Sequence, residues 1–73
     1  MGKLHVLFGK QVCGILAENG FVLVRQRGSH IIMQKRIAGS TITVPVPNHR
    51  ELASGTMSSI VRQSQLSRSA FES

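Results

Sequence analysis

Few side chains in this sequence could take part directly in a chemical reaction. The 73 residues include nine Lys or Arg, three His, three acidic residues, all of them Glu, and one Cys. Two-metal hydrolysis needs several acidic ligands, and paired-carboxylate or Ser-His-Asp chemistry needs acids that this chain cannot readily supply. The three Glu are far apart in the sequence, and there is no Gly-rich phosphate-binding motif. Histidines and cations are what remains for catalysis.

Histidine and cations suit the metal-free cleavage of RNA. RNA carries its own nucleophile, the 2′-hydroxyl, so the reaction needs a base for that proton, a donor for the leaving 5′-oxygen and cations around the phosphorane. A histidine titrates near neutrality and can act as base or acid, while Arg and Lys stabilise the developing charge. No metal or cofactor is expected, because Cys13, His5, His30 and His49 show no paired ligand spacing.

His30 is the best placed of the three histidines. It follows the turn signal Gly28-Ser29 and starts an expected strand, so it should be partly exposed and rigidly held. The commoner situation for a lone histidine is partial burial with a bond to a backbone carbonyl, and this alternative stays open. Five residues near His30 in the sequence are expected to grip phosphate: Arg25, Arg27, Gly28, Ser29 and Lys35.

Other polar and aromatic residues carry weaker signals. His49 lies beside Arg50 in an expected loop, where it is a second acid–base group, an RNA contact or, most commonly, a solvated loop residue. Cys13 is interpreted as a small core residue and not as a nucleophile. The chain has no Trp or Tyr, and its three Phe are expected in the core, so stacking on single-stranded bases is poorly supported: Phe8, Phe21 and Phe71.

The formal net charge of +6 favours an anionic partner, either nucleic acid, an anionic membrane surface or an acidic protein. Simple solubility is the alternative explanation of this charge. No stretch is long and apolar enough to span a membrane, and the start of the chain lacks a secretory signal, so the expected compartment is the cytoplasm. Residues 1–73 are expected to form one domain, whose small core would benefit from a partner protein.

Hydrophobic periodicity predicts the elements that position these residues. The first expected element is a helix over Gly9–Gly20, and three strands follow over Phe21–Arg27, His30–Arg36 and Thr41–Val46. A second helix is expected to begin at Gly55 with Thr56 as its N-cap, and a short turn should follow Ser67. Pro45 cannot donate to a ladder, so the third strand is expected at a sheet edge. This order predicts an α+β, α-β-β-β-α double-stranded-RNA-binding-like fold, with two helices on one face of a three-stranded antiparallel sheet.

Three runs of residues form a specific combination. The first is Asn19–His30, with sequence NGFVLVRQRGSH; the second is Thr43–Val46 followed by Arg50-Glu51-Leu52; the third joins Gly55-Thr56-Met57, Ser59–Gln63 and Leu66-Ser67. Together they resemble the HicA toxin family, over a match from about Gly9 to Phe71.

This resemblance implies a toxin of a type II toxin–antitoxin system that cleaves mRNA with relaxed sequence preference and is neutralised by a HicB-type antitoxin. It also implies that His30 is the catalytic histidine. At the next position, where members of the family often carry a second histidine, this chain has Ile31. Ile37-Ala38 precede Gly39 where the family usually has a more polar turn.

Two other functions stay open on the sequence alone. A non-catalytic double-stranded-RNA-binding-like module fits the fold, although such modules normally place lysines at the start of the second helix, and Ser54–Ser59 contains no cation. A protein-interaction domain could instead dock its cations on an acidic partner, which is compatible with a toxin covered by its antitoxin.

Overall fold

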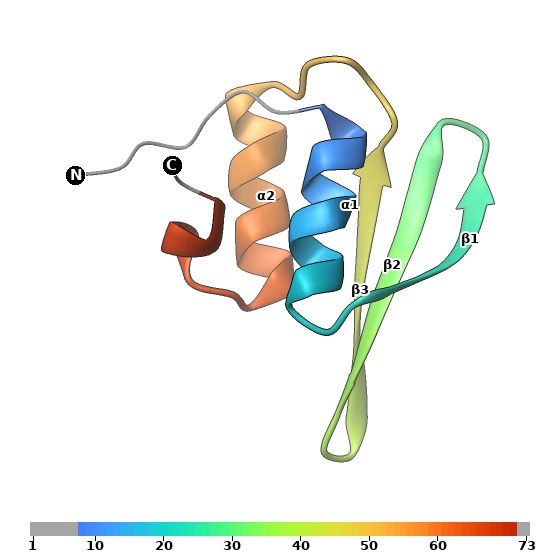
Figure 1. Cartoon of the computed structure of the whole chain (residues 1–73), viewed down its shortest axis with the longest axis vertical. Coiled ribbons are helices and arrows are strands. Elements are labelled where there is room, and N and C mark those ends of the chain that lie inside the picture. Colours follow the sequence, from blue (N-terminus) through green and yellow to red (C-terminus); the bar gives the residue numbers. More distant parts are fainter. Residues whose placement is uncertain (1–7, 72–73) are drawn as a thin grey trace.

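The computed structural model describes residues 8–71, so His5 lies outside the described residues. Figure 1 shows α1 (Gly9–Glu18), β1 (Val22–Arg27), β2 (His30–Ile37), β3 (Ser40–Pro47), α2 (Ser54–Ser64) and the 3-10 helix η1 (Arg68–Phe71). The strands form one antiparallel sheet in the order β1-β2-β3, and both α-helices cover the same face of it (Figure 1). The expected α+β, double-stranded-RNA-binding-like fold is confirmed. Within residues 8–71, no helix combines the length and apolarity needed to cross a membrane.

The first helix ends at the predicted Asn19-Gly20 pair. Gly20 takes a φ of 94°, a left-handed conformation that glycine adopts without steric cost. The Phe21 N–H then donates to the Leu16 carbonyl at 3.0 Å, and the Gly20 N–H donates to the Ala17 carbonyl at 3.2 Å. This pair of bonds satisfies the last helical carbonyls and directs Phe21 into the core beside Leu16.

The hydrophobic core lies between the two helices and strands β2 and β3. Its members are Val12, Leu16, Phe21, Ile31, Met33, Ile42, Val44, Val46, Leu52, Met57, Ile60 and Phe71. None of the six residues of β1 belongs to it, because all of them are exposed. The sheet is therefore covered unevenly. Strands β2 and β3 pack against the helices, and β1 extends away from them (Figure 1).

Phe8 is not a core residue, which corrects the expectation for one of the three phenylalanines. Its side chain is 50% exposed, whereas Phe21 and Phe71 are buried. Phe8 is the N-cap of α1, and its backbone N–H donates to Gln11 Oε1 at 2.7 Å. A cap residue lies outside the helical face that enters the core, so the ring stays in contact with solvent.

The second helix begins at Ser54, with Ala53 as its N-cap, so the prediction that Thr56 caps it is wrong. Leu52 is buried directly before the cap and fixes the place where the chain turns into the helix. The expected last turn is confirmed as η1, where the Ser69 N–H donates to Ser67 Oγ at 3.3 Å.

Candidate functional site

His30 is the first residue of β2 and follows a two-residue hairpin turn. Gly28 takes a φ of 57° as the first residue of that turn, a position that suits glycine. The register pairs His30 with Arg27 of β1 on one side and with Pro47 of β3 on the other. Because directly opposed residues of antiparallel strands share a face, these three side chains form a row across the sheet.

This row lies on the sheet face that the helices leave open. Ile31 and Met33 enter the core on the helix side, so the alternate positions of β2 belong to the opposite face. The Gln34 amide donates to Thr43 Oγ1 at 3.2 Å across that open face, where the register pairs the two residues. His30 is exposed there, between a guanidinium and a proline.

A bulge in β1 brings a second arginine onto the same face. The register shifts between Leu23, which pairs with Met33, and Arg25, which pairs with Ile32. Val24 is the extra residue, and without it the alternation of the strand would place Arg25 and Arg27 on the helix side. The bulge therefore lets the strand place Leu23 on the helix side and both arginines on the side of His30.

The residues expected to grip phosphate do not all lie together. Gly28 and Ser29 form the turn beside His30, and Arg25 and Arg27 share its face. Lys35 lies five positions along β2 from His30, about 17 Å away, and on the helix side. Its ammonium nitrogen is 5.9 Å from the centre of the Phe21 ring.

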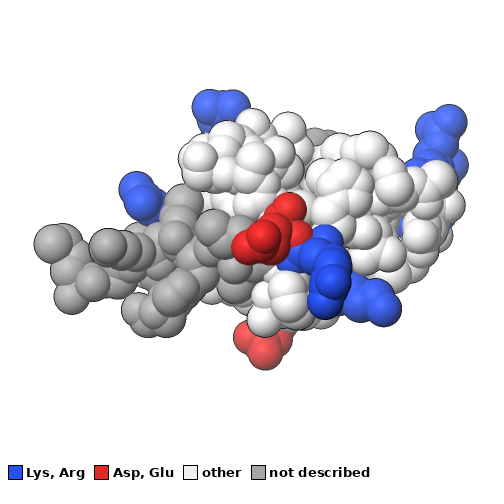
Figure 2. All heavy atoms as spheres, turned by 90° about the horizontal axis from the view of Figure 1, so that it is seen from above, with Lys and Arg blue, Asp and Glu red and all other residues white. Residues whose placement is uncertain are grey.

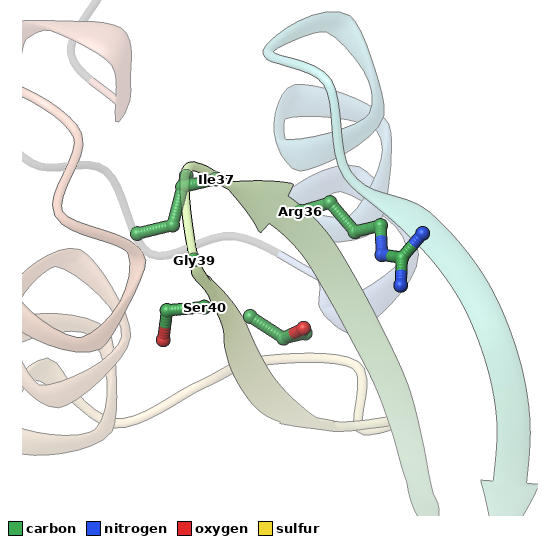
Figure 3. A pocket seen from close by; sticks show the side chains of 5 residues that line it. Arg36, Ile37, Gly39 and Ser40 are labelled. Atoms are coloured by element: carbon green, nitrogen blue, oxygen red, sulfur yellow. The ribbon is translucent and has the colours of Figure 1, made fainter.

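Arg36 is a cation of the open face that the sequence interpretation left out. It occupies an even-numbered position of β2 and is paired with Thr41, so it shares the face of His30. The strict alternation of β2, counted from His30, is the signal that could have identified it in place of Lys35. In Figure 3 its guanidinium reaches toward β1, away from the side chains of Ile37 and Ser40.

The chain that leaves β3 returns to the turn beside His30. The Asn48 N–H donates to the Ser29 carbonyl at 2.6 Å, and the Gly9 N–H donates to the His49 carbonyl at 2.9 Å. His49 is thus brought to the same end of the sheet as His30. It lines a shallow hollow at the start of α1, with Phe8, Lys10, Asn48 and Arg50 around it.

Figure 2 looks onto this end of the molecule, where the β1–β2 turn and the loop after β3 lie. Lys and Arg side chains stand at separate places around its outline, with acidic side chains between some of them. In this view the cations do not form one continuous basic patch. The positive charge near His30 is therefore a local arrangement of arginines set by strand register.

Comparison with known families decides where this chain belongs. The family model described as HicA toxin of bacterial toxin–antitoxin matches residues 9–66, well over half of the chain. The chain belongs to the HicA toxin family. A search of curated proteins gives no match. The match to the HicA model includes the Gly28-Ser29 turn, all three strands and both α-helices.

The hollows at the other end of the HicA sheet do not belong to the His30 region. Two adjoining hollows share Arg36 and Thr41, and the one shown in Figure 3 is also lined by Ile37, Gly39 and Ser40. The hollow in Figure 3 lies at the β2–β3 hairpin, about 20 Å along the strand from His30, and the second extends from Arg36 and Thr41 past Gln34 to Gly20 and Val22. A ligand in these hollows would not touch the histidine.

Cys13 of the HicA chain is poorly suited to attack a substrate. It lies on α1, is partly buried and packs against the core. Burial raises the pKa of its thiol by desolvating the thiolate, so the thiol is protonated at neutral pH. Within residues 8–71, no three His, Cys, Asp or Glu side chains are grouped as metal ligands.

Proposed function

We propose that this chain is the toxin of a type II toxin–antitoxin system, a metal-independent endoribonuclease that cleaves mRNA in the cytoplasm and is neutralised by a HicB-type antitoxin. His30 is its catalytic histidine. The observation that carries the proposal is the row in which Arg27 lies directly across from His30 on the open sheet face, in a chain of the HicA family. An exposed imidazole beside a guanidinium suits a reaction that moves a proton next to a phosphate.

The proposed reaction uses the nucleophile within the RNA. His30 accepts the proton of a 2′-hydroxyl, and the 2′-oxygen attacks the adjacent phosphorus. The P–O5′ bond breaks, the leaving oxygen takes up a proton, and the products are a 2′,3′-cyclic phosphate and a 5′-hydroxyl. His49 is the candidate proton donor because the Asn48–Ser29 bond brings its segment to the same end of the sheet.

The arginines hold the phosphate in this proposal. Arg27 and Arg25 lie in successive rows of the open face, paired with His30 and Ile32. The Gly28-Ser29 turn lets a phosphate approach the backbone, because a Cβ at Gly28 would meet nothing within 4 Å. Lys35 contributes to packing over Phe21 and lies outside this phosphate site.

A longer RNA strand has further contacts, one along the open face and one beside the start of α1. Arg36 lies at the far end of β2, so the cations of the open face are spread over more than one phosphate spacing. The half-exposed ring of Phe8 offers a stacking surface near the hollow that His49 lines. Both contacts favour single-stranded RNA, which is flexible enough to follow them.

The decisive experiment incubates the purified chain with end-labelled single-stranded RNA in EDTA, beside a His30→Ala variant with the same circular dichroism spectrum. We expect cleavage by the wild type, with 2′,3′-cyclic phosphate ends, and a rate at least about 100-fold lower for the variant. A folded His30→Ala protein that cleaves as fast as the wild type would refute the role of His30. RNA retention without cleavage by either protein would instead favour the non-catalytic RNA-binding module.

A further inference from the structure

The two edges of the sheet differ in their capacity to accept another strand. β3 carries Pro45 and Pro47, which have no N–H to donate, and proline is a common way to block an edge. β1 contains no proline and no lysine, and its outer backbone groups face away from β2. Its bulge at Val24 interrupts the ladder at one place only. β1 is therefore the edge on which a further strand can form.

β1 also exposes an unusual amount of apolar surface. Val22, Leu23 and Val24 are 60%, 59% and 42% exposed, the longest consecutive run of exposed large apolar side chains in residues 8–71. Leu23 lies on the helix side of the sheet, but neither helix covers it. Contiguous apolar side chains at an open strand edge are typical of a surface that a partner covers.

Charge indicates which partner fits this surface. Arg25 and Arg27 complete β1, so a strand along it would meet apolar side chains first and cations next. A second copy of the chain is a poor occupant, because parallel pairing of two β1 strands would align their arginines, and any pairing would bring together two chains that each carry a net charge of +6. An acidic partner gains from the same charges.

We propose that the antitoxin docks on β1 by strand addition. An extended antitoxin segment pairs with the free edge of β1, with apolar side chains over Val22–Val24 and acidic side chains near Arg25 and Arg27. The identity of the partner rests on the proposed function, but the location rests on the open edge, the apolar run and the charge of β1.

This geometry accounts for neutralisation without burial of the histidine itself. A strand added to β1 lies about 5 Å from it, two strand spacings from β2 and His30. The acidic side chains of the added strand form ion pairs with the guanidinium of Arg27, which is the direct cross-strand neighbour of His30. The arginines are then no longer available to bind phosphate, and the RNA can no longer approach the open face.

The test measures the affinity of a purified HicB-type antitoxin for two single variants of the full chain. Leu23→Glu places a charge in the apolar run of β1, and Ile37→Glu makes the same kind of change at an exposed apolar residue of β2, 39% exposed at the opposite end. We expect Leu23→Glu to lower the affinity at least about 30-fold and Ile37→Glu to leave it unchanged. Both side chains are exposed, so both variants should fold and still cleave RNA.

Hydrogen exchange of the complex provides the second measurement. Strand addition predicts slower exchange of the amides in Val22–Arg27 on antitoxin binding, and unchanged exchange along β3. Wild-type affinity of Leu23→Glu for the antitoxin, or protection elsewhere with β1 unchanged, would overturn the docking mode. If the wild type is a dimer and Leu23→Glu dissociates it, β1 is a self-association surface. If Leu23→Glu loses RNA binding and keeps its affinity for the antitoxin, β1 is an RNA-binding surface.

These outcomes separate this proposal from the function itself. A wild type that binds the antitoxin through β1 but never cleaves RNA leaves the docking site standing and removes the nuclease. A Leu23→Glu protein that cleaves RNA and still binds the antitoxin normally leaves the nuclease standing and removes the docking site. An antitoxin that does not bind the wild type contradicts both.

Discussion

The Asn48 N–H donates to the Ser29 carbonyl at 2.6 Å, so the segment that leaves β3 is fastened to the turn directly before His30. The neighbouring residue, His49, accepts the N–H of Gly9 at 2.9 Å. The hairpin turn, the end of β3 and the start of α1 are therefore one hydrogen-bonded unit. This unit sets where His30 stands relative to the rest of the chain.

The Asn48–Ser29 bond gives the first prediction. Asn48→Pro removes the donating N–H, whereas Asn48→Ala keeps it and removes only the side chain. We expect the proline variant to lose about 0.5–1.5 kcal/mol of unfolding free energy and between about tenfold and 100-fold in RNA cleavage, since catalysis is sensitive to small misplacements. Urea unfolding and initial cleavage rates check both effects. Equal activity of the two variants would show that this bond does not position His30.

Two glycines of α1 give the second prediction. A Cβ on Gly9 would meet the Pro47 carbonyl oxygen and lie 3.0 Å from the Asn48 Cα, while a Cβ on Gly14 would meet nothing within 4 Å. Gly9→Ala should therefore destabilise the fold by about 1–3 kcal/mol, because backbone must move. Gly14→Ala should stabilise it by about 0.5–1 kcal/mol through its better helix propensity. Thermal unfolding of the two variants should shift in opposite directions, and shifts of the same sign would contradict the contact at Gly9.

Two adjacent cations of β2 give the third prediction. Arg36 lies on the open face and Lys35 on the helix side over Phe21. Arg36→Gln and Lys35→Gln remove the same charge, but only the first should weaken single-stranded RNA binding and lower the slope of log affinity against log salt by about 0.7. Fluorescence anisotropy in a His30→Ala background measures binding without cleavage. A larger effect of Lys35→Gln on affinity would place the RNA on the helix side.

Cys13 gives a prediction about pH. Burial raises the pKa of its thiol in the folded chain above that of the unfolded chain. Below about pH 8 both states hold the proton, so stability is unaffected by this group; above about pH 8.5 the unfolded chain loses the proton first, so stability falls. Urea midpoints at pH 7 and pH 9.5 should therefore drop more for the wild type than for Cys13→Ala. An equal drop would show that the thiol is not desolvated.

Most of the fold could be predicted from the sequence because its signals are local. The alternation of Ile42, Val44 and Val46, the Asn19-Gly20 stop and the Gly28-Ser29 turn each depend on a few neighbouring residues. The start of α2 was predicted wrongly because no side-chain cap marks it: its N-cap is Ala53, which follows the buried Leu52. Phe8 was misplaced because an aromatic residue alone does not reveal that it caps a helix.

The candidate site was predictable only in part. His30 and its turn follow from local sequence, and strand alternation alone would have separated Arg36 from Lys35. The bulge at Val24 could not be predicted, because no glycine marks it and it shows only in the pairing of β1 with β2, where Leu23 and Arg25 take opposite faces. The Asn48–Ser29 bond joins segments far apart in the sequence, so it depends on the assembled sheet.

The bulge in β1 has a consequence for protein engineering. A β-strand has a parity, and an odd insertion reverses it for every residue beyond. Here the alternation of faces that starts at Phe21 holds only as far as Leu23, and the residues after Val24 follow the alternation set by the hairpin turn. Anyone who aligns or grafts this hairpin must therefore number its arginines backward from the turn, because a count forward from the helix assigns them to the wrong side.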